Sequence, residues 1–389
     1  MLELKDSILK IIQGYKYFAL IDISQGFNIY NYECKLAASP KYPGMRVEYL
    51  NDKLVSLTSD VAAIIDTTNN KIVRLFEIGT GKPWPNTIEH TSDIVELAMN
   101  YSEMDRKIAF IDSNKDLYIS PIAKPDVVKI GTMAETLKWN AYNDALACFA
   151  DGKLVIWGYP NAAYIDKDIL EHSKNIIECP HIGRFPTILS YIGNLVEVRK
   201  MDGTTIVFTG GMNVSIIYHF VDKGQWSEAV RLCRFLKDHM LWGCLAGMSI
   251  ANRELDTAEN SLASVNELDK VQYINKINAL PSDASKNAAI SLFSGKIKEA
   301  ETILLTAKLY YRAIKMNIKL FKWERALEIA LSYKTHIDTV IAYRSTYLAQ
   351  EQKKESIDKF LQMTDKIDIN WDTIKEKIKK DKESEKTGT

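Results

Sequence analysis

The chain has 389 residues, enough for two or more domains, and its 46% hydrophobic and 26% charged residues are typical of a folded protein. Fifty Lys and Arg residues balance fifty Asp and Glu residues, which gives a formal net charge of zero. A neutral chain lacks the long-range attraction that nucleic acid or an anionic membrane surface would exert, so we expect neither as its main partner.

Cysteine usage and hydropathy indicate a cytosolic protein. The five cysteines follow no regular spacing, and an odd number fits a reducing compartment better than a disulfide framework. The N-terminal sequence MLELKDSILKIIQ is interrupted by charged residues, so it lacks the apolar core of a signal peptide. No later run reaches the ~18 apolar residues of a membrane span, so we expect no membrane insertion.

Short β-rich runs separated by turn signals fill residues 1–212. A turn followed by a strand of alternating apolar residues recurs, with the first apolar residue at Ile72, Leu117, Leu154 and Leu195, at intervals of 45, 37 and 41 residues. A period of ~40 to 45 residues is typical of a WD-type β-propeller. Because the repeat is degenerate, a β-sandwich remains the alternative.

Two residues fit the WD pattern by position. Trp157 lies where such blades end their third strand with Trp-Asp, although Gly158 replaces the Asp, and His90 lies at the usual Gly-His place after Glu89. About 210 residues at ~42 per blade predict about five blades. We therefore expect either a small closed ring or a partial propeller that lacks its first blades.

Three groups of residues could suggest chemistry, and we expect none of them to carry it. The segment Gly79–Lys82 lacks the upstream Gly and the downstream Ser or Thr of a phosphate-binding loop, so we expect a turn between strands. His172, Cys179 and His181 lack the second close pair of a structural zinc site. No Ser, His and Asp set or carboxylate pair stands out. We expect no catalytic, cofactor-binding or metal-binding residues, and therefore no enzyme.

From residue 213 the hydrophobic period changes to that of amphipathic helices. The segments GQWSEAVRLC (224–233) and FKWERALEIA (321–330) match, and RELDTAENSL and GKIKEAETIL are weaker copies. All four carry a large apolar residue, Ala three positions later and an apolar residue seven positions later. The alanines are 29, 42 and 26 residues apart, around the ~34 residues of a tetratricopeptide-type helix pair. The pattern predicts an irregular α-solenoid over residues 213–370, a fold whose concave surface generally holds other proteins.

Aromatic residues recur in this region, and we expect them to be core residues rather than anchors for a partner. They are Trp226, Trp242, Tyr311, Phe321 and Trp323.

Residues 371–389 mix charges of both signs with little apolar content. We expect a fraying helix that passes into a disordered tail. A basic tubulin-binding tail is a second interpretation, which Asp381, Glu383 and Glu385 weaken because they dilute the positive charge.

Six blocks in the right order resemble one known family, the eighty-kilodalton WD-repeat subunits of intraflagellar transport complex B. They are SPKYPGMR (39–46), GTGKPW (79–84), DRKIAFIDSNKDLYI (105–119), WSEAVRLCRFLK (226–237), DKVQYINKI (269–277) and KTHIDTVIAYR (334–344). Family members carry two propellers before the helical region. This chain would correspond to most of the second propeller and the solenoid.

The resemblance implies a non-enzymatic scaffold in the trains that kinesin and dynein motors move along ciliary microtubules. Its partners would be other complex B subunits, with the motors as indirect partners, and a homodimer stays open. Its location would be the cilium, at the axoneme and basal body, together with the cytoplasm and cytoskeleton. A vesicle-coat subunit with the same order of propeller and solenoid is the alternative.

Overall fold

The computed structural model describes residues 8–22, 26–103, 105–211, 213–364 and 369–387. Contacts within the chain divide it into two compact units. The propeller unit consists of Met1–Ala251 and Asn260–Asn266, and the solenoid unit consists of Asn252–Glu259 and Glu267–Thr389.

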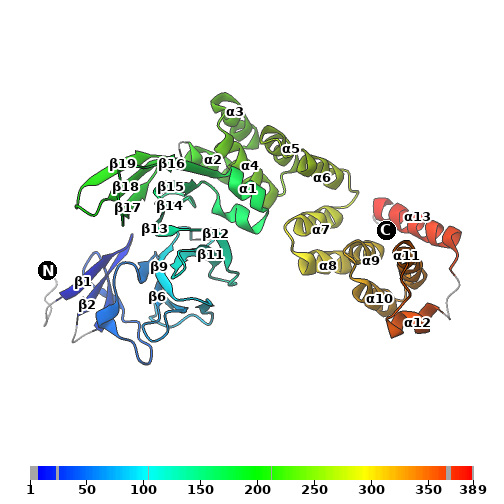
Figure 1. The fold of residues 1–389 in the computed structure, drawn as a ribbon, viewed down its shortest axis with the longest axis horizontal. Helices are drawn as coiled ribbons and strands as arrows, with labels where there is room; N and C mark the ends of the chain where they lie inside the picture. Colours follow the sequence, from blue (N-terminus) through cyan, green and yellow to red (C-terminus); the bar gives the residue numbers. More distant parts are fainter. Residues whose placement is uncertain (1–7, 23–25, 104, 212, 365–368, 388–389) are drawn as a thin grey trace. The chain divides into compact units, whose positions relative to one another are not determined.

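Five antiparallel sheets follow one another through the propeller unit (Figure 1). Consecutive strands pair within each sheet; over the described residues, the first four sheets have four strands each and the fifth has three. In sheet order the strands are β1 (Ile8–Gln13), β2 (Tyr17–Asp22), β3 (Gly26–Asn31) and β4 (Leu36–Ala38); β5 (Val55–Leu57), β6 (Val61–Ile65), β7 (Ile72–Glu77) and β8 (Ile88–Glu89); β9 (Ile94–Met99), β10 (Lys107–Asp112), β11 (Leu117–Pro121) and β12 (Val128–Gly131); β13 (Ala134–Trp139), β14 (Leu146–Ala150), β15 (Lys153–Trp157) and β16 (Lys174–Glu178); and β17 (Thr187–Ile192), β18 (Leu195–Arg199) and β19 (Thr205–Thr209).

This succession of small meander sheets confirms the predicted five-bladed propeller, and the β-sandwich alternative is wrong. A sandwich would need two large sheets packed face to face. Trp157 is the last residue of β15, the third strand of the fourth sheet, where the WD pattern placed it.

A buried aspartate ends or directly follows the second strand in each of the first three sheets. Asp22, Asp66 and Asp112 are all 1% exposed. Their carboxylates accept nearby backbone N–H groups at 2.8 to 3.2 Å, from Gly26, Thr68 and Asn114 respectively. Burial alone would raise the pKa of Asp112, but hydrogen bonds from its turn and from His90 outweigh burial and lower it. The blades therefore repeat a side-chain cap as well as a strand pattern.

His90 takes the place that the WD pattern predicts. Its Nε2 lies 3.3 Å from Oδ2 of Asp112, and its ring packs 4.5 Å from that of Tyr118, measured between centroids. The histidine thus ties the segment before β9 to the turn after β10.

Apolar side chains join neighbouring sheets. Ile21 and Phe27 of the first sheet share one core with Val55 of the second. On the two terminal sheets, by contrast, large apolar side chains face solvent, among them Ile11 at 61% and Val207 at 57% exposure.

Three helices that follow the fifth sheet in the chain lie wholly in the propeller unit. They are α2 (Val214–Asp222), α3 (Trp226–Leu236) and α4 (His239–Ala251), and α4 contacts β16 and α1 (Lys167–His172). Residues 240–250 of α4 are all buried. Gly243 and Gly247 let α4 pack closely against α1, since a Cβ at Gly243 would lie 2.5 Å from the carbonyl of His172. The last strand therefore ends at Thr209 and α2 begins at Val214, while the compact unit continues to Ala251.

The remaining chain forms a succession of helices and contains most of the solenoid unit (Figure 1). They are α5 (Leu255–Ser264), α6 (Leu268–Asn278), α7 (Asp283–Phe293), α8 (Ile297–Thr306), α9 (Tyr310–Lys319), α10 (Trp323–Ser332), α11 (Ile337–Gln350), α12 (Asp358–Thr364) and α13 (Trp371–Thr387). In the described ranges of the chain, no helix is both long and apolar enough to cross a membrane.

The repeated alanines are buried as the helical repeat requires. Ala229, Ala258, Ala300 and Ala326 each have 0% exposure and lie in α3, α5, α8 and α10. Each of these helices begins two residues after a backbone position with positive φ, at Gly224, Arg253, Gly295 or Phe321. One left-handed residue reverses the chain, and the small alanine then admits the neighbouring helix.

In the C-terminal segment, for which we expected a fraying helix that passes into a disordered tail, Trp371–Thr387 forms α13. Ile374 is fully buried, and the helix contacts α11. Its charged residues pair with residues far away in the sequence, such as Lys377 with Asp338. These contacts supply the stabilisation that the composition of the segment lacks.

Candidate functional site

The segment Gly79–Lys82 forms the turn after β7, as predicted. The N–H of Gly81 donates to the carbonyl of Glu77 at 2.8 Å, and the hydroxyl of Thr80 donates to the Glu77 carboxylate at 2.7 Å. Gly81 has a φ of +69°, which suits a residue without a side chain.

His172, Cys179 and His181 are not assembled into a ligand set. Nδ1 of His172 lies 2.8 Å from Nε2 of His239, and Cys179 is a buried thiol whose pKa burial raises. Among the residues that the structure describes, no three His, Cys, Asp or Glu side chains gather where they could hold a metal ion.

The aromatic residues divide between core and surface. Trp242, Tyr311 and Trp323 are buried, which confirms their assignment to the core. Trp226 is only half-buried. Phe321 is 62% exposed, so its core assignment is wrong; it occupies the left-handed turn position before α10 and leans on the ring of Tyr347.

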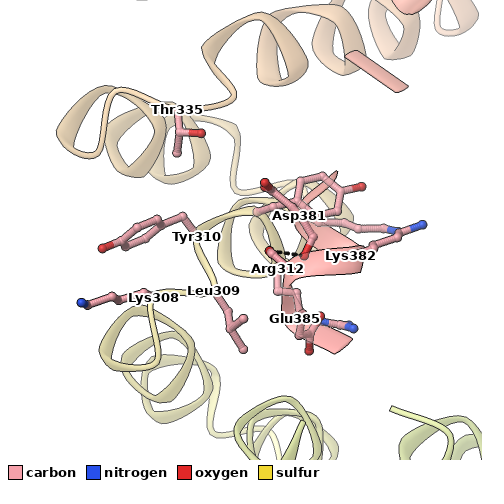
Figure 2. A pocket seen from close by; sticks show the side chains of 11 residues that line it. Lys308, Leu309, Tyr310, Arg312, Thr335, Asp381, Lys382 and Glu385 are labelled. Atoms are coloured by element: carbon pink, nitrogen blue, oxygen red, sulfur yellow. Dashed lines mark hydrogen bonds and ion pairs between the residues drawn. The ribbon is translucent and has the colours of Figure 1, made fainter. Parts of the chain in front are cut away.

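One polar site of the solenoid unit holds the carboxylate of Glu385, a residue of α13. The side chain is only 3% exposed. It accepts hydrogen bonds from Nε of Arg312 at 2.5 Å, from the hydroxyl of Ser282 at 2.8 Å and from the hydroxyl of Ser285. We call Ser282, Ser285 and Arg312 the carboxylate clamp; Figure 2 shows Glu385 beside Arg312.

Local structure explains why the clamp prefers an anion. Ser282 is the N-cap of α7, and its oxygen also accepts the N–H of Ser285, so the carboxylate lies at the positive end of that helix. Arg312 reaches the same point from α9. Burial alone would raise the pKa of Glu385, but the bonds from Ser285, Arg312 and Ser282 outweigh burial and lower it.

One helical turn earlier, α13 makes a second polar contact. Nε2 of His336 lies 2.6 Å from the carboxylate of Asp381, and its Nδ1 lies 3.1 Å from the Thr339 hydroxyl. Asp381 and Glu385 therefore present two carboxylates to the inside of the solenoid unit, spaced four residues apart on one helix face.

Beside the clamp lies an open groove of about 300 Å³ between α6, α7, α8 and α9. We call it the α6–α9 groove. It is lined mostly by apolar side chains, and Arg312 and Ser285 belong both to the groove and to the clamp. Its apolar lining includes Ile277, Leu280, Ala288, Leu292, Leu304 and Met316, and its cations are Lys276, Arg312, Lys315 and Lys319.

Neither the clamp nor the groove was predicted from the sequence, although part of the signal is present in it. Arg312, Lys315 and Lys319 recur at intervals of three and four residues, which places them on one face of a helix. The serines of the clamp carry no comparable pattern.

Comparisons with known proteins match both parts of the chain. The family model described as the IFT80 second beta-propeller matches residues 1–212. The model described as the IFT80/172/WDR35/WDR19 TPR domain matches residues 241–387.

Curated relatives agree with these matches. "Intraflagellar transport protein 80 homolog" of Rattus norvegicus is 43% identical over 385 residues, which cover 97% of this chain and 49% of the relative, and the Mus musculus homolog has the same figures. "Intraflagellar transport protein 172 homolog" of Mus musculus is 21% identical over 318 residues, covering 74% of this chain and 17% of the relative. The chain spans about half the length of the first two relatives.

Proposed function

The chain belongs to the intraflagellar transport protein 80 family, and from that membership we propose that it is a non-enzymatic scaffold subunit of intraflagellar transport complex B. The observation that carries the proposal is the 43% identity over 97% of the chain, which runs through both the propeller and the helical repeat. A protein that shares both parts is expected to share the assembly in which they act.

The fold supports a role in binding and holding other proteins. Repeat helices present extended surfaces rather than one deep reaction pocket. The clamp binds α13 through the carboxylate of Glu385, and hydrogen bonds of this kind serve to recognise one structural element by another. Burial raises the pKa of the thiols of Cys148 and Cys244 far above the usual range, so neither is suited to act as a nucleophile.

We propose other complex B subunits as direct partners and the kinesin and dynein motors as indirect ones. The proposed location is the ciliary axoneme and basal body, with a cytoplasmic and cytoskeletal pool. Pairing of two copies belongs to the same proposal and is tested by light scattering. We do not propose the vesicle-coat alternative, because the curated relatives named above are intraflagellar transport proteins.

The test is a pull-down of the tagged chain from ciliated cells, with the bound proteins identified and the tag imaged. Complex B subunits in the pull-down and signal along the axoneme would support the proposal. Ala326→Trp is the control that disrupts the repeat, because Ala326 is fully buried, and Glu324→Ala on the exposed face of α10 is its matched neutral variant. Recovery of coat subunits, or of none of complex B by the unaltered chain, would refute it.

A further inference from the structure

The α6–α9 groove combines an apolar floor with a cationic rim. Ile277 of α6, Leu292 of α7 and Met316 of α9 line it, and Lys276 and Lys319 stand exposed at its edge. A surface of this kind matches an amphipathic helix, which inserts apolar residues spaced three and four apart.

Of the four cations at the groove, Arg312 pairs with Glu385, whereas Lys276, Lys315 and Lys319 have no ion pair among the described residues. Among the described residues that line the groove there is no Asp or Glu. Lys315 is half-buried and faces the ring of Tyr311, 5.7 Å from its centroid. Burial, together with the nearby charges of Lys319, Lys382 and Arg312, lowers the pKa of Lys315. Gathering like charges beside an apolar surface is unfavourable for the free protein, and an anionic ligand would relieve it.

The solenoid unit itself shows which group one of these cations binds. Arg312 lines the groove and at the same time binds Glu385, a carboxylate carried by a helix. On α13 the acidic residues Asp381 and Glu385 lie one turn apart, and both face the solenoid (Figure 2). The groove extends from the carboxylate clamp, with which it shares Arg312. Lys315 and Lys319 can pair with a further carboxylate, because the described residues include no ion pair to either.

We propose that the α6–α9 groove binds an amphipathic helix of a partner protein whose apolar stripe is bordered by Asp or Glu residues. The inference rests on the proposed scaffold function and names the chemistry of one partner. The apolar stripe would cover Ile277, Leu292 and Met316, and the bordering carboxylates would pair with Lys276, Lys315 and Lys319.

The test uses three synthetic 20-residue helical peptides that share Leu at positions i, i+3, i+4 and i+7. The residues beside this stripe are Glu in the first peptide, Gln in the second and Lys in the third. Binding to the full chain is followed by fluorescence anisotropy. We expect saturable binding of the Glu peptide, at least tenfold tighter than either control, and weaker in higher salt. Equal binding of the Gln or Lys peptide would overturn the proposal.

Charge reversal locates the site. Lys315→Glu combined with Lys319→Glu is expected to weaken binding of the Glu peptide at least tenfold. Lys319→Glu alone, at an exposed position that leaves Glu385 undisturbed, is expected to weaken it about threefold. Lys298→Glu on the exposed face of α8, outside the groove lining, is the matched control and should change binding less than twofold. Unchanged binding in the folded Lys319→Glu variant would overturn the assignment to this groove.

The inference and the proposed function fail in different ways. If the unaltered chain recovers complex B subunits but the Glu peptide does not bind, only the groove inference fails. If the peptide binds and no complex B subunit is recovered, only the scaffold proposal fails. If Lys319→Glu dissolves a homodimer seen by light scattering, the groove holds a second copy of this chain, and the proposal of a different partner is overturned.

Discussion

Replacing Glu385 with alanine is expected to release α13 from the solenoid unit without unfolding that unit. The carboxylate accepts bonds from Arg312, Ser282 and Ser285. The two serine hydroxyls lie 2.9 Å apart and can bond to each other, and the Arg312 side chain is 29% exposed and can regain water. The expected loss of free energy holding α13 in place is therefore that of about one charged hydrogen bond rather than three, roughly 2 to 3 kcal/mol.

A loss of this size raises the open population of α13 by about 30- to 140-fold, because each 1.4 kcal/mol corresponds to a factor of ten. Hydrogen exchange measured by mass spectrometry would show this as faster exchange of amides 371–387, while the amides of α9 and α10 keep their protection. Glu376→Ala removes the same charge from an exposed position of the same helix and should leave exchange nearly unchanged. Equal acceleration in the two variants, or none in Glu385→Ala, would refute the clamp.

Three further outcomes follow from burial, close contact and charge. Trp323→Ala should lower the free energy of unfolding by about 3 to 5 kcal/mol in urea titrations, whereas Trp226→Ala, at a half-buried site, should cost about half as much; equal losses would contradict the burial difference. Gly243→Ala should lower the stability of the propeller unit by about 1 to 3 kcal/mol in thermal melts, because the backbone of His172 blocks a Cβ there, while Gly79→Ala, with open space around it, serves as the tolerated control. Because the pKa of Glu385 is lowered in the folded state, its contribution is fully present above the unfolded value of about 4.3 and is lost as the pH falls through the folded value. The methyl NMR signal of Ile374 should therefore stay constant from pH 7 to about 5 and shift below about 4, and a shift near neutral pH would contradict this assignment.

The repeats were predictable because their causes are local. Strand and turn residues alternate within ~45 residues, so the blade period is visible without knowledge of contacts. The same holds for the buried alanines, whose spacing from Trp323 or Ile297 fixes which face of the helix they share. A further local signal was available, since Ile-Asp recurs at Asp22, Asp66 and Asp112, separated by 44 and 46 residues.

Two features that the sequence patterns did not predict depend on contacts between residues distant in the chain. The extension of the propeller unit to Ala251 depends on the contact of Gly243 with His172, 71 residues earlier. Phe321 looked like a core residue because it precedes Trp323, but the chain reversal places it in a turn. Neither fact is encoded in the hydrophobic period of a single helix, which specifies a buried face but not what covers it.

The C-terminal helix shows why neutral composition was a weak guide to recognition. A net charge of zero argues against long-range steering, because charges beyond about 8 Å are screened at physiological salt. Within that distance only local arrangement matters, and here the cations along α9 lie beside one carboxylate of α13, that of Glu385. Glu385 and Arg312 are 73 residues apart in sequence, so a window of the tail sees only mixed charge and predicts disorder. Binding by such a surface should therefore depend on matched short-range pairs over an apolar floor, with specificity set by the spacing of a partner's carboxylates rather than by their number.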